Sequence, residues 1–254
     1  MHNLDANWHY ESLTPNLVQA ERITEVLFEG KTPYQKVSIV DAACFGKMLL
    51  LDGKTQSTEV DEFVYHEALV QPTMIAHSNP KRVFVAGGGE GATIREVLKH
   101  KSVTKVVMVD IDEQVIELCQ RYLPSFHEGA FNDPRLDLHY ADASRFLEES
   151  DQEFDLAIID VPDPLEEGPA YMLFTQEFYR LLRKSLASGG MMVAQAGPTG
   201  PAFAQQCFSA VAKTVQSVFT NVYMCEAFVP SFGSTWGFVV GSLGPDPSGL
   251  SAKE

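Results

Sequence analysis

The segment RVFVAGGGEGATIREVL, residues 82–98, decides the fold of this chain. Residues 82–86 read as a buried strand, because they are mostly apolar and a run of glycines follows them at once. Ile94, Val97 and Leu98 then recur at helical spacing. A strand, a glycine loop and a helix in this order let a ligand approach the backbone beside a helix N-terminus. A glycine loop alone also matches a simple tight turn, so both interpretations stay open at this point.

The same alternation of strand and helix continues along the chain. Further apolar runs at residues 106–109, 136–138, 156–159 and 191–194 are separated by helical patterns. This order predicts an α/β fold with a Rossmann-like, methyltransferase-type doubly wound sheet. The last two strands, near residues 222–227 and 238–241, are linked too closely for a helical crossover. We therefore expect them to pair antiparallel.

The N-terminal part of the sequence has a different pattern. Residues 37–40 and 48–51 read as strands around a turn at residues 45–47, and Asp52-Gly53 ends this hairpin. The pattern predicts a small antiparallel β unit. We expect an N-terminal β-hairpin domain at residues 1–60 and a Rossmann-like catalytic domain at residues 61–254.

Composition narrows the class of ligand and the cellular compartment. The formal net charge of −15 disfavours nucleic acid and anionic membranes, which need their phosphates neutralised. It suits cationic small molecules, although acidity also serves solubility alone. We expect no membrane span and no secretory signal, and the four scattered cysteines read as reduced core thiols. By elimination, these features predict a cytoplasmic protein. The seven histidines lack paired metal-ligand spacing, so no metal is expected.

Acidic residues follow the predicted strands. Glu90 lies inside the glycine loop, Asp110 ends the second strand, Asp142 follows the third, and Asp160 and Asp163 follow the fourth. Ligands bind at the carboxyl ends of strands in such sheets, so we expect the five carboxylates to converge on one crevice. Like charges repel at close range, and a cationic ligand would offset that cost. The negative charge of Glu90 would repel a pyrophosphate, so we do not expect that ligand in this loop.

Two of the strand-end regions have a purely structural alternative. Asp112 is placed to cap the helix that begins at Glu113, and Asp142 is placed to cap the helix at residues 144–148. Asp110 is placed to accept hydrogen bonds from ribose hydroxyls, which acids at this position do in nucleoside-binding folds. For Asp142, ligand binding and capping both remain open, with capping slightly favoured.

Five ordered motifs together resemble the spermidine synthase family over nearly the whole chain. They are residues 51–56 (LDGKTQ), 61–67 (DEFVYHE), 87–100 (GGGEGATIREVLKH), 110–112 (DID) and 160–164 (DVPDP). The resemblance implies aminopropyl transfer from decarboxylated S-adenosylmethionine, with no tightly bound cofactor and with 5′-methylthioadenosine as product. It also implies a homodimer or homotetramer.

The resemblance further implies a role for each matching position. Asp160 is the catalytic acid, and Tyr65 orients the attacking amine. The implied donor-binding positions are Gln56, His66, Gly87, Glu90, Asp110, Ile111, Asp142 and Ala143. The implied acceptor-binding positions are Tyr65, Asp160 and Asp163, and we expect Phe232 and Trp236 to be walls of the acceptor pocket. Residues 165–170, which are rich in Pro, Gly and acids, are expected to form a lid.

Departures from the family pattern bear on the acceptor. The family more often has Asp where this chain has Glu90, and Gln is common where His66 stands. The run at residues 229–232 (VPSF) replaces a Pro-Thr-Tyr run. With residues 163–169 and 195–198, these changes look more like plant-type thermospermine synthases. They favour spermidine as acceptor and thermospermine as product, with spermidine synthase (putrescine acceptor) and spermine synthase as alternatives.

Two more distant functions are also compatible with parts of the sequence. A methyltransferase would use intact S-adenosylmethionine, whose carboxylate Glu90 would repel. A catalytically silent polyamine-binding protein would not need both Asp160 and Tyr65. We therefore expect an enzyme in which Asp160, beside Tyr65, takes the proton of the attacking amine.

Overall fold

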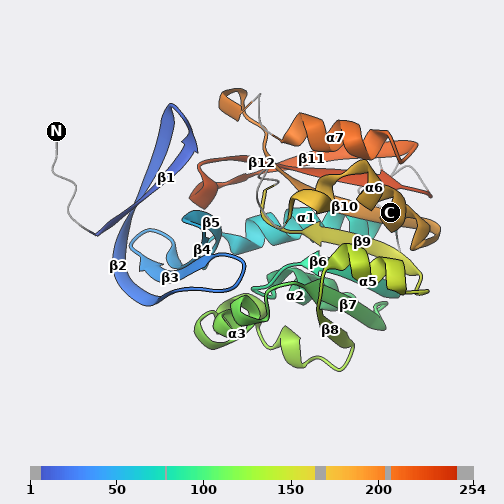
Figure 1. Ribbon diagram of the computed structural model, residues 1–254, viewed down its shortest axis with the longest axis horizontal. Coiled ribbons are helices and arrows are strands. Elements are labelled where there is room, and N and C mark those ends of the chain that lie inside the picture. Colours follow the sequence, from blue (N-terminus) through green and yellow to red (C-terminus); the bar gives the residue numbers. More distant parts are fainter. Residues whose placement is uncertain (1–6, 78, 164–169, 204–206, 245–254) are drawn as a thin grey trace.

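The structure is a computed structural model that describes residues 7–77, 79–163, 170–203 and 207–244. Two β-sheets lie side by side, a smaller one built from the N-terminus and a larger one from the rest of the chain (Figure 1). Most of the predicted lid at residues 165–170, and the tail beyond Gly244, lie outside the described residues.

The smaller sheet has five antiparallel strands in the order of the sequence. Its strands are β1 (Trp8–Thr14), β2 (Leu17–Lys31), β3 (Lys36–Ala42), β4 (Gly46–Leu51) and β5 (Lys54–Thr58). The predicted hairpin corresponds to β3 and β4, and it is the buried centre of this sheet. β1 is missing from the sequence prediction because its side chains are half-buried or exposed and show no clean alternation.

The larger sheet confirms the predicted doubly wound fold. Its strands follow the order β11-β12-β10-β9-β6-β7-β8, and the five from β10 to β8 are parallel. The bounds are β6 (Arg82–Gly87), β7 (Lys105–Asp110), β8 (Leu136–Tyr140), β9 (Phe154–Asp160), β10 (Leu186–Pro198), β11 (Asn221–Val229) and β12 (Ser234–Ser242). β11 and β12 pair antiparallel, as expected. The chain order reverses between β6 and β9, which is where such sheets bind ligands.

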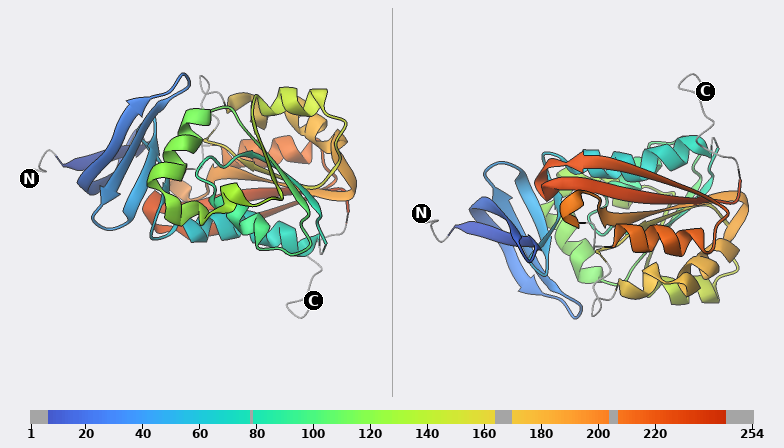
Figure 2. Two further views of the ribbon diagram at one scale, coloured as in Figure 1. Left: turned by 90° about the horizontal axis from the view of Figure 1, so that it is seen from below. Right: turned by 90° about the horizontal axis from the view of Figure 1, so that it is seen from above.

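Helices cover both faces of the larger sheet (Figure 2). One face packs against α1 (Glu62–Ala76), α2 (Ala92–Leu98) and part of α3 (Glu113–Tyr122). The other face packs against α5 (Ala143–Glu149), α6 (Gln176–Lys184) and α7 (Phe208–Gln216). Short segments complete the described fold, namely α4 (Pro124–His127), η1 (Ala130–Asn132), η2 (Tyr171–Phe174), η3 (Pro201–Phe203) and η4 (Pro230–Phe232). Among the described residues, no helix is long and apolar enough to cross a bilayer.

The smaller sheet is fastened to the larger unit by apolar and polar contacts. Val37, Ile39, Leu49 and Leu51 pack against α3 and α4 in one buried cluster. The tip of the β2–β3 hairpin also reaches Asp112, whose Oδ2 accepts a hydrogen bond of 2.6 Å from Thr32 and one of 3.0 Å from Gln35. These contacts hold the smaller sheet beside the carboxyl ends of β6, β7 and β9.

Candidate active site

The glycine loop passes directly against the end of β9. Gly88 donates its N–H to the carbonyl of Asp160 at 2.8 Å. Gly87 has a φ of +80°, and a Cβ atom there would lie 2.1 Å from the same carbonyl oxygen. Only glycine fits this position without displacing backbone. The loop therefore brings Glu90 beside Asp160.

Asp160 and Tyr65 form the centre of the site. The Tyr65 hydroxyl donates to Asp160 Oδ1 at 2.7 Å, and the Thr93 hydroxyl donates to Asp160 Oδ2. Burial and the charge of Glu90 raise the pKa of Asp160, while His66 and the two hydroxyl hydrogen bonds oppose this shift. Burial and Asp160 hold the pKa of Tyr65 well above its usual value, so Tyr65 remains a hydrogen-bond donor. Asp160 is thus a half-buried carboxylate held by two neutral hydroxyls.

Glu90 is paired with a buried histidine. His66 Nε2 lies 2.7 Å from Glu90 Oε1, and His66 Nδ1 lies 2.9 Å from Glu62 Oε2. Burial lowers the pKa of His66, but the hydrogen bonds to Glu62 and Glu90 outweigh it and raise the pKa to about 10. The imidazolium form of His66 would offset the charge of Glu90, and the repulsion of a ligand carboxylate by Glu90 stays a prediction. His66, Glu90 and Asp160 place ligand-type atoms within 4.8 Å of one another. Both ring nitrogens of His66 face carbonyl or carboxylate oxygens, so we interpret this cluster as an ion pair beside a base.

The two acids after β7 have different neighbours: Asp110 lies near the glycine loop, and Asp112 caps a helix. Asp110 Oδ2 lies near Gly89, 3.3 Å from where a Cβ atom would stand. Burial and the charges of Asp112, Glu90 and Asp160 raise the pKa of Asp110 to about 6. Asp112 caps α3 through the N–H of Val115 at 3.3 Å, which confirms the predicted cap.

The acid after β8 is exposed and also caps a helix. Asp142 Oδ1 accepts the N–H of Arg145 at 2.9 Å at the start of α5. Its predicted capping role is therefore confirmed, while its adenine-binding role stays a prediction. Ala143 is buried at the start of α5, Ile111 is half-buried just after β7, and Gln56 is half-buried in β5, where its amide donates to the Lys54 carbonyl at 3.1 Å.

A second group of side chains surrounds Asp163. Gln195 donates to the Val161 carbonyl at 2.7 Å and to Asp163 Oδ1 at 3.3 Å. The same amide accepts a hydrogen bond of 3.0 Å from Trp236 Nε1. Burial raises the pKa of Asp163 to about 6, although the Gln195 hydrogen bond and the Lys54 charge lower it. Gln195 thus holds an acid and an aromatic ring in fixed positions.

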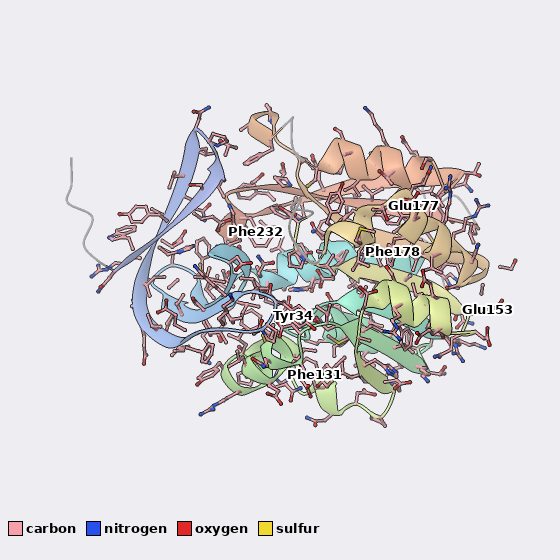
Figure 3. The ribbon with its side chains drawn as sticks, viewed as in Figure 1. Tyr34, Phe131, Glu153, Glu177, Phe178 and Phe232 are labelled. Carbon is pink, nitrogen blue, oxygen red and sulfur yellow. The ribbon has the colours of Figure 1, made fainter. Side chains whose placement is uncertain are left out.

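Aromatic rings connect these two groups. The ring of Phe232 lies 5.8 Å from that of Tyr65 and 4.7 Å from that of Trp236. Figure 3 labels Phe232 where the smaller sheet meets the larger unit. Phe232 and Trp236 therefore link Tyr65, beside Asp160, to the group around Gln195 and Asp163.

Several contacts of these residues were not predicted from the sequence. Thr93, Glu62 and Gln195 contact Asp160, His66 and Asp163 respectively. Glu11 in β1 forms an ion pair with Lys54 at 3.6 Å, and both charges act on Asp163. The only sequence signal for Glu62 was its place one turn before His66, which helical spacing could have exposed. Glu11 offered no such signal, because it comes from the distant first strand.

The arrangement suits proton removal from a cationic substrate. Asp160, Asp163 and Asp110 contribute negative charge to the site, while Glu90 pairs with His66. A buried carboxylate with a raised pKa is a competent base near neutral pH. Aromatic rings and carboxylates also provide favourable surroundings for an extended ammonium compound.

Known proteins are similar to this chain in sequence and in architecture. Residues 62–246 match the spermine/spermidine synthase domain, and residues 7–59 match the spermidine synthase tetramerisation domain. A polyamine aminopropyltransferase of Sulfurisphaera tokodaii is 44% identical over 98% of this chain and 81% of its own length. Thermospermine synthase ACAULIS5 of Arabidopsis thaliana is 42% identical over 94% of this chain and 70% of its own. A solved spermidine synthase in complex with the transition-state analogue AdoDATO has a TM-score of 0.90 at 34% identity, and covers 94% of this chain and 81% of that one.

Proposed function

Because this chain belongs to the spermine/spermidine synthase family and is a polyamine aminopropyltransferase, we propose that its acceptor is spermidine and its product thermospermine. The donor is decarboxylated S-adenosylmethionine, the co-substrate of this family, and the second product is 5′-methylthioadenosine. The hydrogen bond of 2.7 Å between Tyr65 and Asp160 is the observation that carries the mechanism.

The reaction replaces a carbon–sulfur bond by a carbon–nitrogen bond. The acceptor nitrogen attacks the methylene group next to the sulfonium, and the electron pair of the broken bond returns to sulfur. Methylthioadenosine therefore leaves as a neutral molecule. Asp160 accepts the proton that the amine loses, and Tyr65 aligns the nitrogen through its hydroxyl. Positioned base catalysis contributes about 10²–10⁴-fold, and orientation of the two substrates supplies much of the rest.

We propose donor-binding roles for the positions that the family resemblance implies. Glu90 binds the donor's terminal ammonium with Oε2, since Oε1 is engaged by His66. Asp110 accepts hydrogen bonds from the ribose hydroxyls, and Ile111 lines that position. Gln56 contributes to the donor's tail, and Asp142 with Ala143 to the adenine.

The acceptor end supports spermidine through charge and shape. Asp163 lies close enough to Tyr65 for its charge to raise the tyrosine pKa, so a second carboxylate acts on the site of attack. Spermidine carries an internal ammonium that such an acid can neutralise. Phe232 and Trp236 border the same region. The similarity to a thermospermine synthase favours attack by the aminopropyl end of spermidine.

Product analysis tests the proposal. The protein is incubated with decarboxylated S-adenosylmethionine and with putrescine, spermidine or norspermidine in separate reactions. Chromatography that resolves thermospermine from spermine then identifies the product. Thermospermine from spermidine is the expected result. Spermine from spermidine, or spermidine from putrescine as the main product, would overturn the proposed acceptor chemistry.

We also propose that the N-terminal sheet mediates a homodimer or homotetramer. Its match to a tetramerisation domain supports this, as does a cavity of about 420 Å³ on the sheet, lined in part by Trp8, Ile23, Val26 and Leu50. Light scattering of the full chain and of V26D is the test. The variant should dissociate, whereas two particles of equal mass would refute the proposed interface. The division of the chain at residue 60 and the cytoplasmic location remain predictions.

A further inference from the structure

Six charged side chains of alternating sign run from the site toward the surface between α1 and α2. Glu90 contacts His66, and His66 contacts Glu62. Arg95 donates two hydrogen bonds, of 2.8 and 3.0 Å, to the carboxylate of Glu62. The series then continues to Glu96 and the exposed Lys99. His66, which follows Glu90 in this series, is fully buried.

The geometry around His66 determines its protonation state. Nδ1 faces two acceptors, the backbone carbonyl of Glu62 at 2.7 Å and its carboxylate at 2.9 Å, so this nitrogen carries a hydrogen. Nε2 faces Glu90 Oε1 at 2.7 Å. The paired Arg95 keeps Glu62 ionised, so its negative charge stabilises a second proton on the ring. A neutral ring would instead turn a lone pair of Nε2 toward the Glu90 carboxylate.

We propose that Glu62 is a positioning residue of the donor site, which keeps His66 doubly protonated and thereby holds Glu90 with its second oxygen toward the donor ammonium. This inference rests on the proposed role of Glu90 in donor binding. Glu62 does not touch the donor itself. It acts through the imidazolium, one side chain removed from the ligand.

The titratable groups that act most strongly on His66 come from three elements. Glu62 and the hydroxyl-bearing Tyr65 lie on α1, Glu90 lies in the glycine loop, and Asp160 lies at the end of β9. The three carboxylates favour the imidazolium, whereas burial opposes it. In E62Q one of these charges is lost and burial is unchanged, so His66 should lose its second proton within the neutral range.

The test compares two ligands of the same donor site. Decarboxylated S-adenosylmethionine carries an aminopropyl ammonium and a sulfonium, and methylthioadenosine lacks both. The sulfonium keeps its charge at every pH. Calorimetry measures both dissociation constants between about pH 6 and about pH 9, the range that brackets a free histidine. In the wild type, any change in the preference for the donor over this range reports the titration of Asp110 and Asp160. In E62Q the preference should fall by about tenfold or more relative to the wild type from the acid to the alkaline end.

E96Q is the matched control, because Glu96 is a buried carboxylate that also pairs with Arg95 but does not contact His66. Its donor preference should follow that of the wild type at every pH. A preference in folded E62Q that also follows the wild type would overturn the inference and leave the proposed function intact. If wild-type protein bound both ligands equally, the donor role of Glu90 would fall, and this inference with it.

NMR of the wild-type protein supplies a second readout that needs no folded E62Q. The ring-carbon and ring-nitrogen shifts of His66, assigned with H66Q, should be those of an imidazolium at about pH 8. A neutral His66 ring at that pH would also overturn the inference.

Discussion

Replacing Asp160 by asparagine tests the proposed base directly. The carboxamide has nearly the same shape, its oxygen can still accept the Tyr65 hydrogen bond, and its NH₂ can donate to Thr93 once that hydroxyl rotates. The donor pocket is therefore preserved, while the base is lost. Loss of a positioned base costs about 10²–10⁴-fold in kcat, equivalent to roughly 3–5 kcal/mol of transition-state stabilisation.

The assay for D160N follows methylthioadenosine release at saturating donor and acceptor, together with calorimetry of methylthioadenosine binding. The expected result is a loss of kcat in that range with little change in the dissociation constant. A decrease of less than about tenfold would refute the role of Asp160 as base.

Thr93→Val is the matched control for D160N, because it removes one hydrogen bond from the same carboxylate and leaves the base in place. The Thr93 hydrogen bond lowers the pKa of Asp160, so its loss should raise that pKa. The variant should lose activity mainly at acid pH and approach the wild type at alkaline pH. A uniform loss at every pH would contradict this explanation.

Three further predictions concern binding and stability. E90Q should weaken binding of decarboxylated S-adenosylmethionine by about tenfold or more but spare methylthioadenosine in calorimetry, and equal losses for both would reject the assignment. Burial, opposed by Gln195, raises the pKa of Asp163 from 3.8 to about 6. The folded chain therefore holds this proton more tightly than the unfolded chain, and stability should fall as the pH rises from about 4 to about 6 and then level off. D163N should remove that fall, which is on the order of 1–3 kcal/mol, and raise the midpoint of thermal unfolding at pH about 8; an unchanged midpoint there would contradict the argument. G87A should prevent folding, whereas G53A, which has a similar φ of +76° but nothing within 4 Å of its Cβ position, should cost only about 1–2 kcal/mol. Comparable unfolding free energies for the two variants in denaturant titrations would show that the contact with the Asp160 carbonyl is unimportant.

Residues at strand ends were easier to predict from the sequence than contacts between distant parts of the chain. The sequence analysis identified Asp110, Asp160 and Asp163 because each follows an apolar run whose end is visible in the sequence. It identified Tyr65 only through the family resemblance. It named residues 195–198 only as part of the resemblance, and did not predict the hydrogen bonds of Gln195 to Asp163 and Trp236, which span 32 and 41 residues of the chain. No local pattern predicts a pairing of that kind.

By itself, the sequence determined the doubly wound sheet, the hairpin of β3 and β4, and the acids at the strand ends. These features follow from short-range periodicity and from glycines, which act over a few residues. Tertiary structure alone decided the electrostatic state of the site. The pKa of His66 is raised because folding places its ring against Glu62, four residues away, and Glu90, 24 residues away, and these contacts outweigh burial. Asp160 acquires its raised pKa in the same way, through burial and through Glu90. Charge interactions depend on distance and burial in space, and neither is written in the order of the residues.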